Sequence, residues 1–344
     1  MENIMASLEK IIPEGIGTLR IRYTLLQAIL ENQPVGRRKL VAITSYSERM
    51  IRNEIEVLST QGLVIVQNSG IVMTVQGEKL VDKLYDPIRK LERFAELENE
   101  LQHILGVRQA IVVKGDVDQS ENTKWRLGKA GANLLKDIIK EDYIISITGG
   151  TTVAKMIESM NTYPNTHNNL TVIAARGSIG ENVQIQANTV AVELAKKIGA
   201  SYELLNIPDN LGMASINTIK QEPHMQKTLQ IMVKSDMIIF GLGEATKMAK
   251  RRTEDPKTLE LLQDKEAVAE AFRCYFDKDG QIVYSSANIG IDLDAAMQIP
   301  IRVAVAGGAS KGLAILASKK LLKDSYLIVD EGAAREILHS ALEF

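Results

Sequence analysis

The chain has 344 residues, which is too long for one hydrophobic core of ordinary size and predicts two or three domains. Charged residues make up 24% and hydrophobic residues 45%, which is typical of a soluble globular protein, and the net charge of −2 excludes a protein that is basic throughout. No apolar run approaches the roughly 18 residues needed to cross a bilayer, and MENIMASLEK at the start lacks a signal-peptide core. We therefore expect a cytoplasmic protein with no membrane partner. The single Cys274 permits no internal disulfide, and the 4 scattered histidines show no ligand spacing with it, so neither a metal site nor a cofactor is expected.

The first part of the chain has the pattern of three short helices. Apolar residues recur at helical spacing in Arg20–Leu30, again over Val35–Thr44, and again over Ser45–Leu63, where Gly62 ends the helix. The following stretch, Leu63–Val75, is typical of two strands joined by an Asn-Ser-Gly turn. Three helices followed by a hairpin predict a winged helix-turn-helix, with the hairpin as the wing.

The third helix is polar on its outer face, and its residue types suit DNA. Arg and Asn make paired hydrogen bonds to base edges in the major groove, and nearby basic residues provide phosphate contacts. The residues expected to contact operator DNA are Arg37, Arg38, Ser47, Arg49, Arg52 and Asn53. Alternatively, this segment could be a small helical cap on a larger domain. Its excess of positive charge is modest, so charge alone does not decide between the two.

Between the two main regions, Gly77–Leu105 carries leucines and other apolar residues at three- and four-residue steps. This predicts an amphipathic linker helix, interrupted near Pro87. The apolar face could form a dimer seam or could pack on the chain's own C-terminal domain, and both alternatives stay open. Helix-turn-helix proteins usually read two half-sites, so we expect a homo-oligomer, either a dimer or a tetramer.

From Gln109 onward, strands and helices alternate, which predicts an α/β domain with a doubly wound, mostly parallel sheet. The expected strands lie near residues 109–114, 143–148, 170–175, 202–207, 236–241, 301–306 and 325–329. The stretch Cys274–Tyr284 breaks the alternation with an Asp-Gly turn between short β-like runs. It is expected to be a hairpin added near the ligand edge.

Three of the apolar runs end at glycines that lead into a helix. They are YIISITGGTT (143–152), MIIFGLGEAT (237–246) and IRVAVAGGASK (301–311). Glycines let the backbone approach a ligand closely, and the start of a helix offers unpaired N–H groups and a positive dipole end to an anion. Because ligands of open α/β sheets lie outside the carboxyl edge of the strands, these loops predict a phosphate-binding site. Each loop taken alone could be only a tight turn.

Two of the loops are expected to close on one phosphoryl group. The first contributes Gly149, Gly150, Thr151 and Thr152, and the second contributes Gly307, Gly308, Ala309, Ser310 and Lys311. A second anionic end needs its own cations, and Arg176 together with the KMAKRR run at 247–252 can supply guanidinium groups. We expect Arg176 and Arg251 to form that second clamp, with Gln184, Gln186 and Glu270 available for sugar hydroxyls. A basic run of this kind can equally be a solvated helix face.

Four segments carry a resemblance to a known family: RRKLVAITSYSERMIRNEIEVL, ITGGTTVAKM, AARGSIGENVQIQAN and VAVAGGASKGLAIL. Over essentially its whole length the chain resembles bacterial transcriptional regulators of the SorC/DeoR type, and among them the regulators of glycolytic genes. The pattern of elements and the resemblance together predict a repressor with a winged helix-turn-helix at 1–76, a linker helix at 77–106 and an effector domain at 107–344. The resemblance also implies a sugar-phosphate-binding fold related to glucosamine-6-phosphate deaminases and ribose-5-phosphate isomerases, and fructose 1,6-bisphosphate as the effector. The choice of Arg251 over Arg252 rests on the resemblance.

A sugar-phosphate isomerase or deaminase is the competing hypothesis. Those enzymes need a general base, often supported by a histidine. In this chain the GLG loop continues as Glu244-Ala245-Thr246 with no histidine to the end of the helix, which counts against turnover. Glu244 and Asp209 stay conceivable bases. A pure protein-interaction module would not explain why glycines punctuate the strands.

Overall fold

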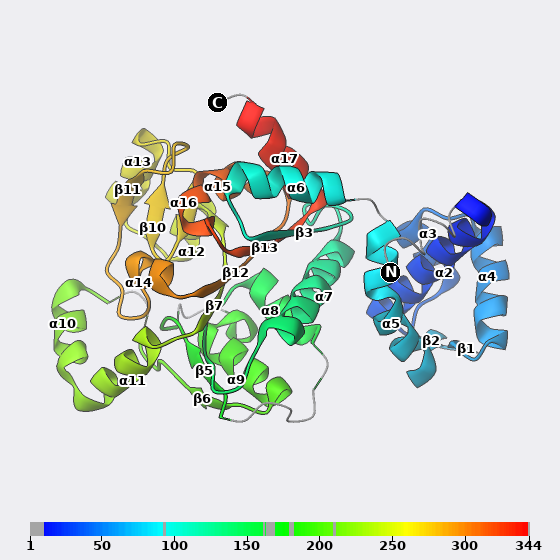
Figure 1. Cartoon of the computed structure of the whole chain (residues 1–344), viewed down its shortest axis with the longest axis horizontal. Coiled ribbons are helices and arrows are strands. Elements are labelled where there is room, and N and C mark those ends of the chain that lie inside the picture. Colours follow the sequence, from blue (N-terminus) through cyan, green and yellow to red (C-terminus); the bar gives the residue numbers. More distant parts are fainter. Residues whose placement is uncertain are drawn as a thin grey trace. The chain divides into compact units, whose positions relative to one another are not determined.

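The computed structural model describes residues 10–91, 94–160, 162, 169–178, 182–208 and 211–342 (Figure 1). The chain divides into two compact units, Met1–Ala95 and Glu96–Phe344, and each has its own core. Within the described ranges no helix is both long enough and apolar enough to cross a membrane.

The N-terminal unit contains the three expected helices and the expected hairpin. Its elements are α2 (Pro13–Asn32), α3 (Arg37–Thr44), α4 (Glu48–Thr60), β1 (Val64–Gln67), β2 (Gly70–Met73) and α5 (Val75–Leu91). The two strands pair antiparallel with Val64 opposite Met73, and Val35 adds one further bridge to Ile71. The prediction of a winged helix-turn-helix arrangement is confirmed.

Apolar side chains from all three helices meet in the core of this unit. Leu25, Ile29, Leu40, Ile51 and Leu58 are fully buried. These residues recur at helical spacing, so each helix buries one apolar face in the core.

The segment expected as one linker helix forms two helices. Pro87 lies inside α5, and the helix continues to Leu91 before a second helix, α6 (Ala95–Leu105), begins. α5 packs on the N-terminal unit, where Val81 and Tyr85 are buried. α6 belongs almost wholly to the C-terminal unit. The interruption therefore falls after the proline.

The C-terminal unit is built on a seven-stranded sheet in the order β3-β13-β12-β7-β4-β5-β6. Every neighbouring pair in it is parallel. Its strands are β3 (Gln109–Val113), β4 (Ile144–Ile147), β5 (Thr171–Ala174), β6 (Ser201–Glu203), β7 (Met237–Gly241), β12 (Ile301–Val305) and β13 (Tyr326–Asp330). All seven expected strands are present, although β6 ends earlier than expected. The prediction of a doubly wound α/β fold is confirmed.

Helices connect these strands and cover the sheet (Figure 1). They are α7 (Glu121–Ile138), α8 (Thr151–Glu158), α9 (Ala187–Ile198), α10 (Met213–Gln221), α11 (Pro223–Val233), α12 (Ala245–Arg251), α13 (Pro256–Asp264), α14 (Leu293–Gln298), α15 (Gly312–Ala317), α16 (Lys319–Leu322) and α17 (Glu331–Leu342), with short 3-10 turns η1 (Val183–Ile185) and η2 (Ala309–Lys311). Except for the edge strand β6, which is largely exposed, the strands are mostly apolar, as expected for a parallel sheet that is covered on both faces.

A second, antiparallel sheet stands beside the first and has the order β11-β10-β9-β8. Its strands are β8 (Gly243–Glu244), β9 (Ala269–Ala271), β10 (Cys274–Phe276) and β11 (Ile282–Ser285). The expected hairpin at 274–284 is confirmed as β10 and β11. The loop after β7 differs from the expectation, because Gly243 and Glu244 pair with β9 before α12 begins.

The strand order of the main sheet creates a switch point and places β3 at the outer edge. The direction of strand succession reverses between β4 and β7, and such a switch point is where ligands bind in open α/β sheets. The outer strand β3 pairs with β13, with Gln109 opposite Tyr326. On β3, the N–H of Val112 donates to Oε1 of Glu98 on α6 (2.9 Å).

Candidate functional site

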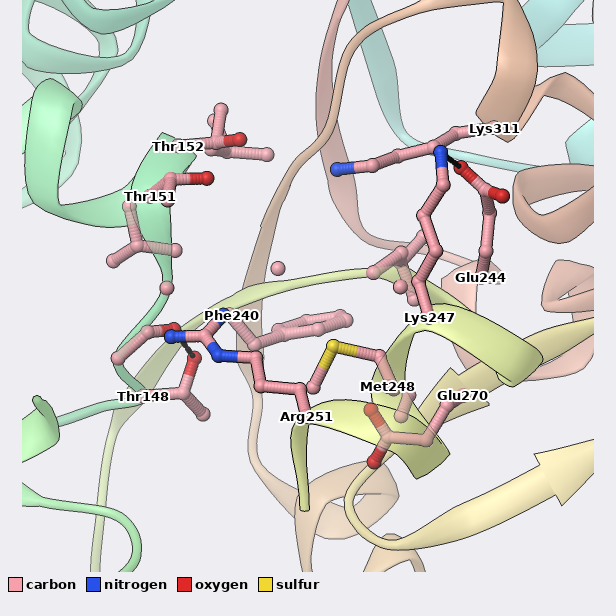
Figure 2. Close-up of a pocket in the computed structure, with 18 of the residues that line it drawn as sticks. Thr148, Thr151, Thr152, Phe240, Glu244, Lys247, Met248, Arg251, Glu270 and Lys311 are labelled. Atoms are coloured by element: carbon pink, nitrogen blue, oxygen red, sulfur yellow. Dashed lines mark hydrogen bonds and ion pairs between the residues drawn. The ribbon is translucent and has the colours of Figure 1, made fainter. Parts of the chain in front are cut away.

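A cavity of about 280 Å³ lies at the carboxyl edge of the main sheet, where β4, β7 and β12 end (Figure 2). Ten of the fourteen residues expected to bind the effector line it: Gly149, Gly150, Thr151, Thr152, Arg176, Arg251, Glu270, Gly307, Ser310 and Lys311. The other four, Gln184, Gln186, Gly308 and Ala309, are not among the described residues that line it. Segments far apart in sequence are thus brought together at one site.

The first glycine loop connects β4 to the start of α8. Gly150 has φ +122° and ψ 154°, a backbone region that is open essentially only to glycine. A Cβ on Gly149 would lie 2.3 Å from the carbonyl oxygen of Ile185, so this position also requires glycine. The loop places Thr151 and Thr152 in the first turn of α8, and the N–H of the N-cap residue Gly150 donates to the carbonyl oxygen of Ile185 (2.9 Å). Figure 2 shows both threonines beside the cavity.

The second glycine loop connects β12 to α15 and has a different environment. The N–H groups of Gly308, Ala309 and Ser310 all donate to carboxylates of the chain itself. The acceptors are Oδ2 of Asp330 (2.8 Å), Oδ1 of Asp116 (3.2 Å) and Oδ2 of Asp118 (2.8 Å), in that order. The hydroxyl of Ser310 lies 3.0 Å from Oε1 of Glu244, to which it donates. Carboxylates thus occupy the backbone donors that the sequence offered to a phosphate.

Lys311 brings a positive charge to the cavity from this second loop. Figure 2 shows its side chain extended toward the side on which Thr152 lies. Burial lowers the pKa of Lys311, while the nearby carboxylates of Glu244, Asp118 and Asp330 partly oppose that shift. Nζ of Lys247 lies 2.6 Å from Oε1 of Glu244, and this hydrogen bond raises the pKa of Lys247.

Basic side chains outnumber acidic ones around the cavity. Among the described lining residues, seven are basic (Lys124, Arg176, Lys247, Arg251, Arg252, Arg273 and Lys311) and three are acidic (Asp118, Glu244 and Glu270). The chain as a whole carries a net charge of −2. The local excess of positive charge favours an anionic ligand in a cavity with low-dielectric walls.

The neighbours Arg251 and Arg252 have different surroundings. Arg251 is half-buried, and Figure 2 shows its guanidinium extended toward Thr148. Arg252 is buried, and its NH2 lies 2.8 Å from Oε1 of Glu270. The same carboxylate oxygen accepts from the backbone N–H of Arg273 (2.8 Å). Glu270, expected to bind sugar hydroxyls, is therefore also one half of a buried ion pair.

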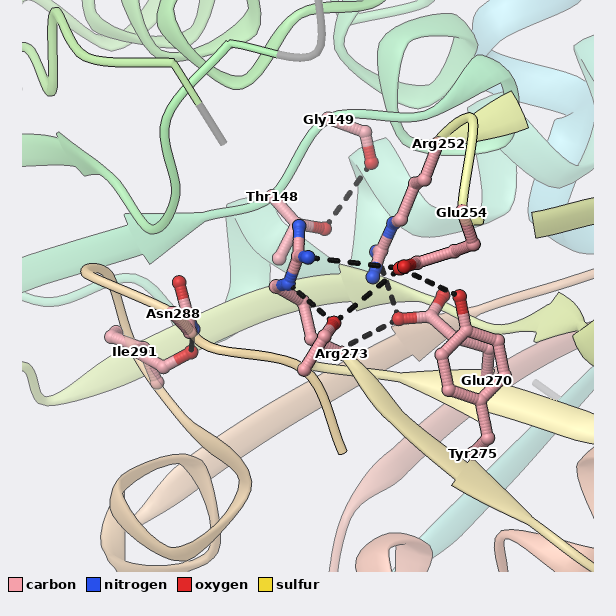
Figure 3. Close-up of polar contacts among 10 residues, drawn as sticks. Thr148, Gly149, Arg252, Glu254, Glu270, Arg273, Tyr275, Asn288 and Ile291 are labelled. Atoms are coloured by element: carbon pink, nitrogen blue, oxygen red, sulfur yellow. Dashed lines mark hydrogen bonds and ion pairs between the residues drawn. The ribbon is translucent and has the colours of Figure 1, made fainter. Parts of the chain in front are cut away.

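This ion pair belongs to a buried polar network (Figure 3). Nε of Arg273 donates to Oγ of Ser286 (2.8 Å), and NH2 of Arg273 lies 3.7 Å from Oε1 of Glu254. The hydroxyl of Tyr275 lies 3.5 Å from the same Glu254 oxygen, and burial raises the pKa of Tyr275. Buried charges of both signs paired in this way fix the shape of the cavity floor.

The turn between β9 and β10 contributes an aromatic residue to the cavity. Phe272 and Arg273 have φ of +51° and +64°, which side-chain-bearing residues rarely adopt. The ring of Phe272 packs against that of Phe240 with centroids 5.2 Å apart. Both aromatic residues line the cavity and give it an apolar wall.

Sequence reasoning missed several lining residues, among them Asp118, Lys124 and Arg273. Asp118 lies shortly after β3, and a polar residue just beyond the carboxyl end of a parallel strand can be predicted to lie near the ligand. No pattern in the sequence indicates Arg273, because its position depends on the pairing of β9 with β10.

Three other residues considered from the sequence are not among those described at the cavity. Gln186 is the residue just before α9, and Gln184 is exposed. Asp209, considered as a base, lies outside the described residues.

The residues expected to contact DNA lie on α3 and α4 of the N-terminal unit. Arg49, Arg52 and Asn53 are exposed on α4, and Arg37 and Arg38 are exposed in the first turn of α3. That turn contains no acidic residue, so positive charge accumulates at the positive end of a helix dipole, where an anion would be stabilising.

Two contacts on α4 have a structural role. Ser47 is the N-cap, and its Oγ accepts from the N–H of Met50 (3.3 Å). Nε of Arg22 on α2 lies 2.7 Å from Oε2 of Glu54, which ties α4 to the rest of the unit. The capping bond accounts for Ser47 without DNA, so the expectation of a DNA contact rests mainly on the other residues of this helix.

Comparison with known families and proteins adds two domain assignments. Residues 89–339 match the family described as "Putative sugar-binding domain", and residues 18–88 match the family described as "CggR N-terminal DNA binding domain". The chain is 35% identical over 339 residues to the central glycolytic genes regulator of Bacillus subtilis, covering 98% of this chain and 99% of the relative.

Solved structures agree with this. A "putative SorC family transcriptional regulator" from Enterococcus faecalis is similar with a TM-score of 0.66 and 35% identity, over 71% of this chain and 99% of that one. The full-length sorbitol operon regulator SorC of Klebsiella pneumoniae has a TM-score of 0.64 at 18% identity, over 72% of this chain and 81% of that one. The second likeness concerns the fold alone.

Proposed function

The chain belongs to the SorC/DeoR-type sugar-binding transcriptional regulators and has an N-terminal DNA-binding domain, and on that premise we propose that it represses glycolytic genes under the control of fructose 1,6-bisphosphate. Its relatives are named as transcriptional regulators, so it is a regulator and not an isomerase or deaminase. As a repressor it works in the cytoplasm, where bacterial DNA lies. Residues 1–76 form the DNA-binding domain in this proposal, 77–106 the linker and 107–344 the effector domain.

One observation carries the effector proposal: several cationic and donor groups line one cavity. We assign the first turn of α8, with Thr151 and Thr152, and the side chain of Lys311 to one phosphate of the effector. We assign Arg176 and Arg251 to the other phosphate. Two anionic groups on one small ligand match this arrangement better than one group does, which favours a sugar bisphosphate over a monophosphate.

The proposal for DNA rests on the exposed face of α4. Arg52 and Asn53 have the donor geometry that reads base edges in the major groove, while Arg37 and Arg38 suit phosphates. Repression through an operator with two half-sites requires a dimer or tetramer. The effector can change operator affinity only if it binds one arrangement of the subunits more tightly than another.

Thermal unfolding with a panel of glycolytic intermediates tests the effector proposal. A ligand that binds only the folded state at about 100 times its Kd adds about 2.7 kcal/mol to the stability. We expect fructose 1,6-bisphosphate to raise the midpoint more than fructose 6-phosphate or glucose 6-phosphate, and unphosphorylated fructose to have no effect. If no phosphorylated sugar raises the midpoint, the proposal is wrong.

Operator titration of Arg52→Ala tests the DNA proposal. A lost base contact should weaken binding by about 1–3 kcal/mol at particular operator positions, whereas a lost phosphate contact would weaken all sequences alike. Lys83→Ala, which removes an exposed charge from α5, is the matched control. Stabilisation by fructose 1,6-bisphosphate should stay unchanged in both variants. If Arg52→Ala binds the operator with normal affinity, the placement of the DNA-reading face on this side of α4 is wrong.

A further inference from the structure

The segment that follows β3 lies against the second glycine loop and presents acidic residues to it. The N–H of Ala309 donates to Oδ1 of Asp116, and the N–H of Ser310 donates to Oδ2 of Asp118. Asp330, at the end of β13, accepts from Gly308 at the same loop. Three carboxylates therefore bind three successive amides of a loop whose sequence is typical of an anion site.

The three carboxylates do not have equal roles. Asp330 is fully buried and also accepts from the N–H groups of Val117 and Ala333, so it is part of the fold. Asp116 also accepts from the N–H of Asp118, at 2.8 Å, which shapes its own turn. Asp118 alone among the three lines the cavity.

Asp118 is held close to the groups that an effector would use. A Cβ placed on Gly308 would lie 2.6 Å from Oδ1 of Asp118, so the carboxylate rests directly on the glycine. The carboxylate is also near enough to Lys311 and Lys247 to act electrostatically on both, and it favours their charged forms. Asp118 therefore bonds one of the loop's amides and acts on the lysine that the loop carries.

We propose that Asp118 is an internal competitor of the effector's phosphate at the second glycine loop, so that an anion binds there only by displacing the Asp118 carboxylate from the amide of Ser310. The inference rests on the proposed function of the cavity. A carboxylate and a phosphate cannot both accept from the same N–H group, and two negative charges in contact repel each other. Asp118 thereby lowers affinity for phosphorylated ligands and sets the concentration at which the site fills.

Loss of the Asp118 carboxylate should raise affinity for the effector. In Asp118→Ala the amide of Ser310 is left to the ligand and the repulsion is gone, so fructose 1,6-bisphosphate should bind about tenfold more tightly, which corresponds to about 1.4 kcal/mol. In Asp118→Asn the charge is lost but an oxygen can still accept from Ser310. Its gain should be smaller, about threefold.

Calorimetric titration of the full-length chain with fructose 1,6-bisphosphate measures these affinities. Asp137→Asn removes a charge from an exposed position on α7 and is the matched control, with the affinity of the unchanged protein expected. The thermal midpoint without ligand is measured for each variant. If Asp118 had only a structural role, replacing it would lower both the thermal midpoint and the affinity, whereas replacing a competitor raises the affinity whatever happens to the midpoint.

The outcomes separate the two ideas. If the unchanged protein binds the bisphosphate and neither Asp118 variant binds it more tightly, the inference is overturned and the proposed function stands. Should Asp118→Ala fail to fold, the isosteric Asp118→Asn decides on the same criterion. Binding by the variants but not by the unchanged protein supports the inference strongly. If none of the proteins binds, the proposed function fails and the inference fails with it.

Discussion

The two glycine loops of the C-terminal unit have nearly the same sequence pattern and different environments. In each, a buried parallel strand ends at two glycines, the second glycine has a positive φ (+122° at Gly150 and +100° at Gly308), and a helical turn comes next. At the first loop, the N–H of Gly150 donates to the backbone carbonyl of Ile185 (2.9 Å), and the first turn of α8 lines the cavity. At the second, the amides from Gly308 to Ser310 donate to carboxylates. A local motif therefore predicts the shape of an anion site but not whether its donors are already engaged.

The largest expected effect comes from removing the carboxylate that holds the second loop. Asp330→Ala would leave the N–H groups of Val117, Gly308 and Ala333 without their acceptor. Each buried unsatisfied group costs about 1–3 kcal/mol, so the free energy of unfolding of this unit should fall by about 3 kcal/mol or more. Urea denaturation followed by circular dichroism measures it.

Asp137→Ala serves as the control for this change, because Asp137 is exposed on α7. Its effect should stay within about 0.5 kcal/mol. Equal stabilities for the Asp330 and Asp137 variants would mean that the second loop does not depend on its carboxylates.

A pair of hydroxyl deletions compares the loops directly. Thr152→Val keeps the shape of a buried side chain and removes a donor proposed to bind phosphate, so affinity for fructose 1,6-bisphosphate should fall by about 1.5–3 kcal/mol. Ser310→Ala should cost less than about 1 kcal/mol, because the Ser310 hydroxyl already donates to Glu244. Calorimetry gives both values. If the two variants lose the same amount of affinity, the two loops do not differ in their contribution to binding.

The proposed second clamp of Arg176 and Arg251 offers a smaller and more specific effect. Arg251→Ala should reduce the preference for fructose 1,6-bisphosphate over fructose 6-phosphate by about tenfold, since a monophosphate does not need the second clamp. Lys250→Ala removes an exposed charge from the neighbouring position and should leave the preference intact. Titration of each variant with both sugars measures this coupling. If the two sugars lose affinity equally, Arg251 is not part of a phosphate clamp.

The smallest expected effect is a dependence on pH that comes from Lys311. Its pKa is lowered by burial, so the lysine loses its proton, and its attraction for phosphate, at a pH below the ordinary value of 10.5. Affinity should therefore decrease as the pH rises from neutral toward that value. Lys311→Met should bind more weakly at neutral pH and lose this decline. A decline that persists unchanged in Lys311→Met would assign it to another group.

Much of this architecture is readable from sequence because it depends on local patterns. The apolar run 237–241 predicts a buried strand, and the glycines at 149 and 150 predict a tight turn. The engagement of the second loop is not readable in this way. It results from the strand order, which brings Asp330 beside Gly308 and the segment after β3 beside both. Likewise, Arg252 and Arg251 are neighbours of the same type, and only the pairing with Glu270 separates their roles.

The pairing of β3 with β13 also has a consequence for how the chain is made. Val117, just after β3, bonds to Asp330, which is 213 residues further on. At about 5–20 residues per second, a ribosome needs about 10–40 s to reach the partner strand. During that time the apolar strand β3 has no neighbour to pair with, although Glu98 on the earlier-made α6 can already accept from the N–H of Val112. A nascent chain therefore cannot complete the main sheet, or the second glycine loop that Asp330 holds, until its last strand has been synthesised and inserted.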